Sequence, residues 1–473
     1  EIYVLDLHGN SLKRETAPAG SQDKNVFDIR QGVAIAFFVK HADGDNATAT
    51  VFHADLWGLR DHKYKWLHAH DTTTTDWQEI NPKSKFYLFV PRDEAALDRY
   101  NQFAQVTDLF PVHSLGIVTS RDSFAIDLER EALKRRIRTF CDPSLTDDMA
   151  RKAFKLRDNR DWKLAEKRRE IQQDGAWEDK ITRCLYRPFD DRWLFYHYHA
   201  IDFGRETVMR HMLTEDRNIA LVTCRQLSTL PWAHAFVSGL VTDNCMISNR
   251  TRERGYHFPL YLYPDIDRHD LFSLLETGKR RPNLDAGVVG ALAEAYGEEP
   301  VPEDTFYYVY AVLYAPSYRE KYAEFLKIDF PRVPFTTDHE LFSTLAGLGR
   351  RLADLHLLRS DALDPPSARF HGEGDNRVAR IKSQGFAYDP RTERVHVNRT
   401  QYFAPVPQEV WEYQIGGYQV AEKWLKDRKD RELGLEEIKT YCHVMTAIQH
   451  TIALQEEIDA LYPEAESEIV EMH

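Results

Sequence analysis

The chain has 473 residues, of which 42% are hydrophobic and 12% aromatic, a composition typical of globular proteins with two or three cores. No apolar run approaches the roughly 20 residues needed to span a bilayer, which excludes membrane-spanning classes. The formal net charge of -13 argues mildly against a nucleic-acid partner, although such binding requires only a local basic face.

The five cysteines are widely spaced and form no C-x-x-C pair. This pattern argues against a zinc site and a disulfide framework, and it predicts a reducing, cytoplasmic compartment. The chain begins inside an apparent strand, without an initiator Met or a basic and then apolar leader. We therefore expect no signal peptide and interpret the sequence as a piece of a longer protein.

The first 90 residues are predicted to alternate strands and turns. Apolar strands are expected at residues 2–7, 32–40, 48–53 and 85–91, with polar turns between them. No glycine-rich phosphate loop separates these strands. This pattern indicates the far edge of a larger sheet.

Residues 91–172 are predicted to be mainly helical and rich in charge, and short strands and turns are expected from residue 182 to residue 264. Basic side chains concentrate between Lys134 and Arg169. They could follow a DNA backbone, but the acidic residues among them favour a solvated surface.

The last third is predicted to be largely helical. Residues 306–327 form a tyrosine-rich helix interrupted near Pro316, and tyrosines at helical spacing indicate a core. Residues 359–376 contain two prolines and two glycines, which predicts a linker or exposed loop. A short strand at 394–398 is expected before two helices at 420–429 and 435–461.

Two segments combine arginines with aromatic residues and end in strand-like runs, at residues 184–196 and 247–263. Guanidinium groups form hydrogen bonds to phosphates and to the edge of guanine, so this composition suits a surface that binds nucleic acid. Residue types alone would favour strands edged by solvated arginines. The order of the motifs along the chain favours the nucleic-acid surface instead.

Seven motifs follow one another along the chain: Val4-Leu-Asp-Leu-His-Gly-Asn10, Asn25-Val-Phe-Asp-Ile-Arg-Gln-Gly-Val-Ala-Ile35, Gly116-Ile-Val-Thr-Ser-Arg-Asp122, Tyr186-Arg-Pro-Phe-Asp-Asp-Arg192, Phe258-Pro-Leu-Tyr-Leu-Tyr263, Tyr308-Val-Tyr-Ala-Val-Leu-Tyr-Ala-Pro-Ser-Tyr-Arg319 and Trp411-Glu-Tyr-Gln-Ile-Gly-Gly-Tyr-Gln-Val420. In this order they resemble the C-terminal part of a Type ISP restriction-modification enzyme, and the resemblance covers nearly the whole chain. In that family one polypeptide joins a nuclease, a helicase-like motor, a γ-class adenine methyltransferase and a target-recognition domain.

The resemblance implies a mixed α/β and α+β fold. Residues 1–90 would be the C-terminal strands of a Rossmann-like methyltransferase sheet, residues 91–360 a target-recognition domain with a helical spacer, and residues 361–473 the strands and helices that complete it. The implied function is sequence-specific recognition of double-stranded DNA in a bacterial or archaeal cytoplasm, as part of phage defence. The upstream methyltransferase, helicase-like and nuclease segments of the parent are the other expected partners.

The resemblance also implies a role for the second predicted strand. The implied recognition would position a target adenine for N6 methylation, and γ-class enzymes carry an aromatic residue that packs on the flipped adenine. Phe38 is the candidate for this role, because an extruded base needs an apolar plane to replace its stacked neighbours. The alternative is that Phe37 and Phe38 face opposite sides of a buried strand.

S-adenosylmethionine is the implied cofactor of the parent enzyme, and its site is expected upstream of this sequence. The only Pro-Pro pair is in Asp364-Pro-Pro-Ser367, whose serine cannot stack on a base. Phe370-His-Gly-Glu-Gly374 imitates a cofactor-binding turn, but no apolar strand precedes it. We interpret both segments as decoys. The chain is therefore predicted to contain no catalytic, cofactor-binding or metal-binding residue and to be inactive alone.

Side chains that make two hydrogen bonds to a base edge are the candidates for reading DNA sequence. Arg187 and Arg192 flank two aspartates, so an internal salt bridge is their competing role. Arg205 and Arg210 are predicted to clamp phosphates. The other DNA-binding candidates lie in predicted turns: Arg225, Gln226, Ser248, Asn249, Arg250, Arg252 and Arg254.

The histidines are predicted to be structural, since none pairs with a carboxylate or cysteine at a metal-ligand spacing. An alternative function is a non-catalytic interaction module, in which the C-terminal helices dock the motor or nuclease of the parent. Basic residues on one concave face would favour DNA recognition, and an apolar concave surface would favour docking. An unrelated hydrolase has little support, because no nucleophile and base pair is apparent.

Overall fold

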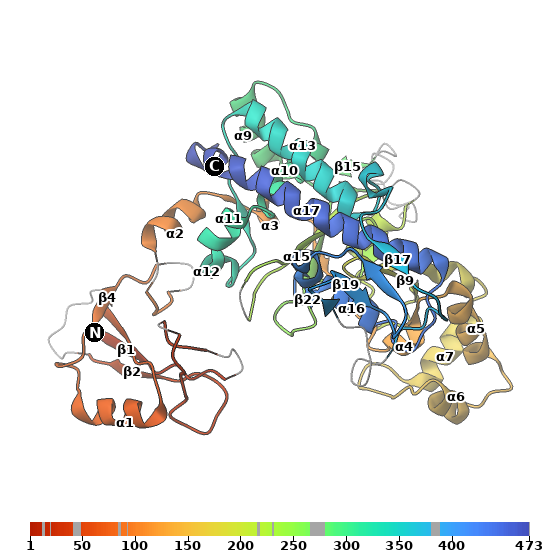
Figure 1. Cartoon of the computed structure of the whole chain (residues 1–473), viewed down its shortest axis with the longest axis horizontal. Helices are drawn as coiled ribbons and strands as arrows, with labels where there is room; N and C mark the ends of the chain where they lie inside the picture. The colour runs from red at the N-terminus through yellow and green to blue at the C-terminus, as the bar shows by residue number, and fades with distance from the viewer. Residues whose placement is uncertain are drawn as a thin grey trace, which may run out of the picture. The chain divides into compact units, whose positions relative to one another are not determined.

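The computed structural model describes residues 1–11, 15–18, 20–40, 49–83, 87–91, 93–214, 218–228, 231–264, 280–379 and 388–472 (Figure 1). The chain divides into two compact units, Glu1–Leu97 and Asp98–His473. Mixed α/β architecture with several small sheets and a helical C-terminal portion agrees with the predicted fold class. The three-part division at residues 90 and 360 stays a prediction.

Unit 1 contains a four-stranded sheet in the order β2-β1-β3-β4. Its strands are β1 (Ile2–Asp6), β2 (Ala34–Phe38), β3 (Val51–Asp55) and β4 (Gln78–Ile80). Strands β1 and β3 are parallel, and the other two pairings are antiparallel. This mixed sheet agrees with the strand-rich opening that the sequence predicts, while its Rossmann-like character stays a prediction.

Helix α1 (Arg60–Ala69) is fixed to the sheet of unit 1 by a buried lysine. Lys63 Nζ lies 2.6 Å from Asp23 Oδ1, and both side chains are fully buried. The same ammonium donates to the carbonyl oxygens of Leu7 and Lys24, at 2.6 and 2.8 Å. These bonds satisfy the buried charge and hold the helix against the exit of β1.

One alternative and one prediction for unit 1 differ from the structure. The alternative of a buried second strand is not met, because 47% of Phe37 and 70% of Phe38 are exposed at this edge of the sheet. Residues 87–91 form no strand, and Tyr87 has a left-handed φ of 46°, which ends an extended run. Residues 85 and 86 of that predicted strand, like residue 48 of the third, lie outside the described residues.

The described residues of unit 2 form three four-stranded sheets, in the orders β11-β10-β13-β6, β12-β8-β9-β7 and β17-β20-β19-β18. Two-stranded pairs join β5 to β16, β14 to β15 and β21 to β22. The strands are β5 (Ala104–Gln105), β6 (Ser114–Leu115), β7 (Ile126–Asp127), β8 (Ile181–Arg187), β9 (Asp190–Phe195), β10 (Ala220–Cys224), β11 (Ala235–Ser238), β12 (Val241–Thr242), β13 (Gly255–Pro259), β14 (Tyr261–Leu262), β15 (Arg281–Pro282), β16 (Arg332–Val333), β17 (Arg369–His371), β18 (Tyr388–Asp389), β19 (Arg394–His396), β20 (Tyr402–Ala404), β21 (Gln414–Ile415) and β22 (Tyr418–Gln419).

The helices that complete the chain are mostly short. They are α2 (Glu94–Asn101), α3 (Val106–Leu109), α4 (Asp122–Ala125), α5 (Arg130–Cys141), α6 (Asp147–Ala153), α7 (Leu164–Gln173), α8 (Glu206–Met209), α9 (Ala286–Tyr296), α10 (Pro302–Val312), α11 (Pro316–Lys321), α12 (Ala323–Leu326), α13 (His339–His356), α15 (Gln408–Glu412), α16 (Val420–Lys426) and α17 (Leu435–Ser467). No helix among the described residues is long and apolar enough to cross a membrane.

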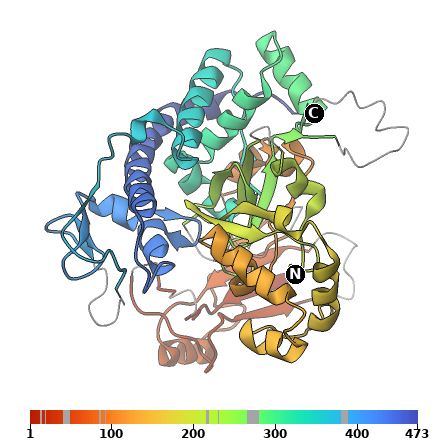
Figure 2. The same cartoon turned by 90° about the vertical axis from the view of Figure 1, so that its right-hand side faces the viewer.

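Helices α5, α6 and α7 carry most of the basic stretch from Lys134 to Arg169, and they enclose an aromatic and aliphatic core (Figures 1 and 2). Arg168 is buried and donates to Asp147 and to the carbonyl oxygens of Phe140, Asp142 and Leu145. Part of the basic stretch therefore holds these helices together, while 93% of the Arg160 side chain is exposed.

The helical core of unit 2 is built on the predicted tyrosine stripe. Tyr308, Tyr310, Tyr314 and Tyr318 are all buried between α10, α11, α13 and α17, and Figures 1 and 2 show α13 and α17 side by side. The predicted interruption near Pro316 is confirmed, because α10 ends at Val312 and α11 begins at that proline. The predicted loop at 359–376 is wrong in part, because β17 lies within it and pairs with β20.

Two fully buried histidines make the stability of unit 2 sensitive to acid. Burial lowers the pKa of His257 and of His356 to about 3, so both rings are neutral in the folded chain. His257 Nδ1 and Thr242 Oγ1 lie 3.0 Å apart, and His356 Nε2 and Thr451 Oγ1 lie 2.9 Å apart. Unfolding returns the histidines to water, where they bind protons below about pH 6.5.

We expect the free energy of unfolding to fall as the pH is lowered from about 6.5 toward 3, by on the order of 1.4 kcal/mol per pH unit for each histidine. Urea unfolding at pH 7, 6 and 5 measures this slope. His356→Gln should reduce the slope by one proton relative to the unaltered chain. An unchanged slope in this variant would contradict the assignment.

Candidate functional site

Tyr186 joins two of the sequence motifs in one place. Its hydroxyl donates to Asp122 Oδ2 at 2.7 Å, which connects β8 to the segment 116–122. The guanidinium carbons of Arg187 and Arg192 lie 3.8 and 4.0 Å from the centroid of its ring. Burial raises the pKa of Tyr186, so the phenol stays protonated and donates. The Tyr186 motif is thus a point of assembly between strands.

Arg187 is buried and forms an internal ion pair. Its Nη1 lies 2.7 Å from Asp243 Oδ1. Burial opposes the charged guanidinium, but the carboxylate of Asp243 raises the pKa of Arg187 above its ordinary value. Arg187 thus has the competing role given for it in the sequence, an internal salt bridge. Its partner is Asp243 and not one of the neighbouring aspartates. Its role in DNA contact stays a prediction.

Arg192 belongs to a buried group of charges, here called the Asp190 cluster: Asp190, Arg192, Asp427 and Arg428. Asp190 accepts from Arg192 Nη2 at 2.6 Å and from Arg428 Nη2 at 2.9 Å, and Arg192 also reaches Asp427 Oδ2 at 2.9 Å. Burial alone would raise the pKa of Asp190, but the charges of Arg428 and Arg192 hold it below its ordinary value. The cluster connects β9 to α16 and the turn that follows it.

Residues 248–254 form a turn between β12 and β13, here called the 248–254 turn, and Glu253 is its internal anchor. The buried carboxylate accepts from Ser248 Oγ at 2.7 Å and from the backbone N of Ser228 at 2.9 Å, and it lies 3.3 Å from His234 Nε2. Burial alone would raise the pKa of Glu253, but hydrogen bonds from His234, Ser228 and Ser248 hold it far below its ordinary value. The turn is therefore held by an ionised carboxylate.

The hairpin β21–β22 supports the 248–254 turn from the C-terminal side. Gly417 N donates to Ile247 O at 2.9 Å, and Tyr418 Oη donates to Cys245 O at 2.7 Å. A Cβ atom on Gly416 would lie 1.8 Å from Ile247 O, and this residue has a φ of 58°. The Gly-Gly pair of the Trp411 motif is thus required by a close approach of two backbones.

The outer side of the 248–254 turn carries the predicted reading residues. Asn249, Arg250 and Arg252 are exposed, and Arg254 is half-buried against Cys245 Sγ. Ser248 is fully buried and donates a hydrogen bond from its hydroxyl to Glu253, so its side chain shapes the turn. This burial corrects the prediction that the Ser248 side chain is presented to DNA. The turn thus presents one amide and two guanidinium groups to solvent on a fixed base.

The remaining candidates lie on other segments. Arg205 has a φ of 59° and places its guanidinium 4.8 Å from the ring centroid of Phe203, which is 54% exposed. Arg210 is half-buried, as is Gln226. Arg225 is exposed and forms an ion pair with Asp329 at 3.0 Å. Phosphate clamping by Arg205 and Arg210 stays a prediction.

Backbone hydrogen bonds connect the Phe203–Arg205 segment to residues 242–244 through the segment 116–118. Val118 N donates to Phe203 O at 3.0 Å, Ile117 N donates to Thr242 O at 2.8 Å, and Asn244 N donates to Ile117 O at 2.9 Å. The segment 116–118 thus lies between the strand ends that lead into both arginine-bearing turns. Phe38 belongs to unit 1 and forms part of that unit's exposed sheet edge.

The two segments that imitate methyltransferase motifs have structural explanations. Ser367 N donates to Thr446 Oγ1 at 3.0 Å, which fixes the Pro-Pro segment to α17. A Cβ atom on Gly372 would lie 2.1 Å from Thr400 O, so this glycine allows the close approach of residue 400. The interpretation of both segments as decoys stays a prediction.

Sequence reasoning missed the acidic residues of the site. Asp243 and Asp427 pair with arginines that are 56 and 235 residues away in the sequence, and no local pattern links such partners. Glu253 gave a signal, because it is the single acid within Ser248-Asn-Arg-Thr-Arg-Glu-Arg254. An isolated carboxylate among arginines in a turn points to an internal anchor.

A family model described as the Type ISP C-terminal specificity domain matches residues 108–457, which include the Asp190 cluster and the 248–254 turn. The chain belongs to this family. The motifs that resemble Type ISP enzymes in the sequence therefore identified the family correctly. No curated protein matches the chain.

Three solved structures share the fold of this Type ISP specificity chain. A DrdV–DNA complex is 22% identical in sequence, with a TM-score of 0.67, and the match covers 96% of this chain and 47% of that chain. A nuclease-deletion mutant of the Type ISP restriction-modification enzyme LlaGI with a DNA substrate mimic is 19% identical, with a TM-score of 0.62, and the match covers 96% of this chain and 36% of that chain. The ATP-dependent Type ISP restriction-modification enzyme LlaBIII bound to DNA is 19% identical, with a TM-score of 0.67, and the match covers 97% of this chain and 30% of that chain. The chain spans less than half the length of each of these proteins.

Proposed function

We propose that this chain reads a sequence in double-stranded DNA on behalf of a Type ISP restriction-modification enzyme. The observation that carries the proposal is the 248–254 turn, which lies within the family match and presents Asn249, Arg250 and Arg252 to solvent. The similar solved structures were obtained with DNA, which supports duplex DNA as the partner.

The chemistry of the turn suits base reading. Arginine makes two hydrogen bonds to guanine in the major groove, and asparagine makes two to adenine. Glu253 and the β21–β22 hairpin fix the backbone of the turn, so little conformational entropy is lost when its side chains dock. Rigid presentation of a few long polar side chains is what discrimination between base pairs requires.

We further propose that the reading positions an adenine for N6 methylation by the parent enzyme. Phe38 supports this step, since a ring that is 70% exposed on an edge strand is available to stack on an extruded base. The exposed edge strand β2 and the parallel pair β1–β3 support a larger, Rossmann-like sheet in the parent. S-adenosylmethionine and the catalytic loop would be supplied by preceding segments of the parent, so no methyl-transfer step is assigned to this chain.

The docking alternative lacks a specific observation. The apolar side chains of α17, among them Val444, Ile448, Leu454 and Ile458, are buried within unit 2. They contact α13 and α11 of the same chain. The 248–254 turn, by contrast, exposes arginines within the family region, which favours DNA recognition.

Fluorescence anisotropy with the 473-residue chain tests the proposal. A duplex selected from a randomised pool should bind, and its affinity should fall steeply with salt. Arg252→Ala should weaken binding by about 1–3 kcal/mol, which is about 5- to 150-fold, and should relax the base preference at one position of the site. Arg351→Ala, an exposed arginine of α13 paired with Glu457, is the matched control and should bind as the unaltered chain does.

Affinity that does not depend on salt would contradict the proposal, because phosphate contacts release counterions. Equal affinity and equal base preference in the Arg252 and Arg351 variants would remove the 248–254 turn from the interface. Loss of affinity without a change in base preference would assign Arg252 to the phosphate backbone instead of a base.

A further inference from the structure

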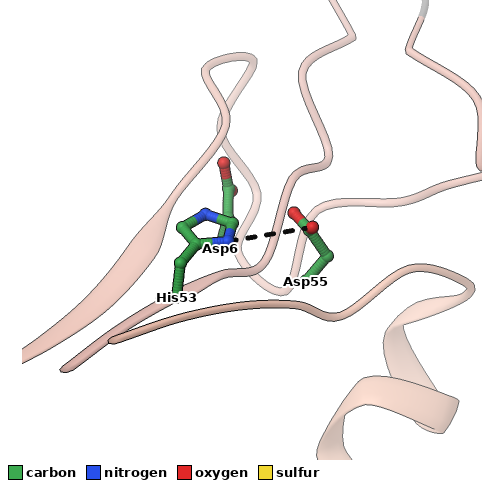
Figure 3. Close-up of side chains that lie close together, drawn as sticks. All are labelled: Asp6, His53 and Asp55. Atoms are coloured by element: carbon green, nitrogen blue, oxygen red, sulfur yellow. Dashed lines mark ion pairs between the residues drawn. The ribbon is translucent and has the colours of Figure 1, made fainter. Parts of the chain in front are cut away.

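Three side chains of unit 1 converge at the carboxyl ends of its two parallel strands (Figure 3). The register places Asp6 of β1 opposite Asp55 of β3, and His53 lies two residues before Asp55 on the same face of the sheet. One potential ligand atom from each of Asp6, His53 and Asp55 lies within 4.8 Å of the other two. Figure 3 shows the imidazole of His53 pointing toward the two carboxylates.

His8 orients both carboxylates and leaves one oxygen of each available. The backbone N of His8 donates to Asp6 Oδ1 at 2.8 Å, and its Nε2 lies 2.8 Å from Asp55 Oδ1. Within the described part of the chain, neither Asp6 Oδ2 nor Asp55 Oδ2 accepts a hydrogen bond, and Asp55 Oδ2 lies 3.9 Å from His53 Nδ1. Two oriented oxygens therefore face the same imidazole.

His53 supplies the independent observation that points to a ligand. Its side chain is only 3% exposed, and its Nε2 is buried without a hydrogen-bond partner among the described residues. A buried polar nitrogen left unpaired is unfavourable by about 1–3 kcal/mol, so an occupant that binds this nitrogen would stabilise the fold. The carboxylates that the ring faces make a cation the chemically appropriate occupant.

We propose that Asp6, His53 and Asp55 bind a divalent transition-metal ion of the zinc class. One imidazole nitrogen and two carboxylate oxygens form a set that such ions accept, and the partial exposure of Asp6 and Asp55 leaves room for water as a further ligand. His8 is a positioning residue, since a histidine that holds the second oxygen of a ligating carboxylate fixes its orientation.

The ion would tie the exit of β1 to the end of β3. The residues that follow β1 turn sharply, with a φ of 49° at His8 and 84° at Gly9. A metal held by Asp6 and Asp55 would fix the start of this turn against the sheet. The sequence gives no sign of the site, because its ligands come from two strands whose paired residues are 49 positions apart and meet only in the folded sheet.

Metal analysis of the whole 473-residue chain tests the proposal with Zn²⁺ as the probe. After treatment with a chelator and equilibrium dialysis, elemental analysis should find one bound zinc per chain. Asp55→Asn keeps the shape of the side chain. Asp55→Asn and His53→Gln, each as a single substitution, should lower the zinc affinity at least tenfold. His8→Gln should lower it by about 10–100-fold through lost orientation. His68→Gln, an exposed histidine on α1, should retain the full affinity.

Thermal unfolding separates loss of a ligand from loss of folding. Zinc at about 1,000 times its Kd should stabilise the unaltered chain by about 4 kcal/mol, which appears as a rise in Tm. The Asp55→Asn variant should keep the metal-free Tm of the unaltered chain within a few degrees and show no rise with zinc. The proposal is overturned if the unaltered chain binds no zinc, or if Asp55→Asn binds it as tightly as the unaltered chain does.

Discussion

Replacing Glu253 with alanine is expected to lower the free energy of unfolding by about 3–5 kcal/mol and to weaken duplex binding at least tenfold. The carboxylate is fully buried and accepts hydrogen bonds from Ser228 and Ser248 while it pairs with His234. Its removal leaves these donors buried without an acceptor, which is a strongly destabilising change. The 248–254 turn would then lose the base that orients its exposed side chains.

Urea unfolding and anisotropy on the same preparations measure the two effects. Arg252→Ala is the informative companion, because an exposed side chain is expected to change stability by less than about 0.5 kcal/mol while it weakens binding. Glu253→Ala should therefore reduce both quantities, and Arg252→Ala only the affinity. An alanine at position 253 that alters neither quantity would show that the carboxylate is not the anchor of the turn.

The sequence offered an internal salt bridge as the competing role of Arg187 and Arg192, but not the partners. Two arginines flank two aspartates in the Tyr186 motif, and both arginines form ion pairs. Their partners include Asp243 and Asp427, which come from other parts of the chain. Such pairings depend on the tertiary fold, so a local pattern cannot specify them.

The helical core was predictable because its signal is local. Buried tyrosines recur at helical spacing over residues 306–322, and proline fixes where one helix ends and the next begins. The sheets of unit 2 were not predictable at the same level, since β13 pairs with β6, about 140 residues earlier. Short strands that pair over such separations carry little periodicity, and their register follows from packing.

The exposure of Phe38 illustrates a different limit. Its apolar run, residues 34–39, has the composition of a buried strand, so composition alone does not predict a ring that is 70% exposed. Only the family resemblance pointed to an accessible Phe38. An apolar composition shows only that the side chains of a strand can be buried. Whether they are buried depends on which strands and helices lie beside the strand in the fold. A strand at the edge of a sheet has a neighbour on one side only.

Asp190→Asn should lower the free energy of unfolding by about 3–5 kcal/mol, because it removes the charge that two buried arginines share. Arg192 and Arg428 both donate to this carboxylate, and their side chains are 14% and 5% exposed. Breaking a buried ion pair leaves an uncompensated charge in a medium that solvates it poorly. The adjacent Asp191→Asn is the matched control: its side chain is 43% exposed and pairs with Arg183 at 3.4 Å, so we expect a change of about 0–1 kcal/mol.

Urea unfolding of the two asparagine variants, followed by circular dichroism, measures the difference directly. The two substitutions have the same chemistry at neighbouring positions of one strand, so any difference between them reports the environment of the carboxylate. The Asp190 cluster joins β9 to α16 and to Arg428 beyond it, and its loss should therefore also loosen the C-terminal segment that supports the 248–254 turn. Equal unfolding midpoints for the two variants would mean that the Asp190 cluster does not hold these elements together.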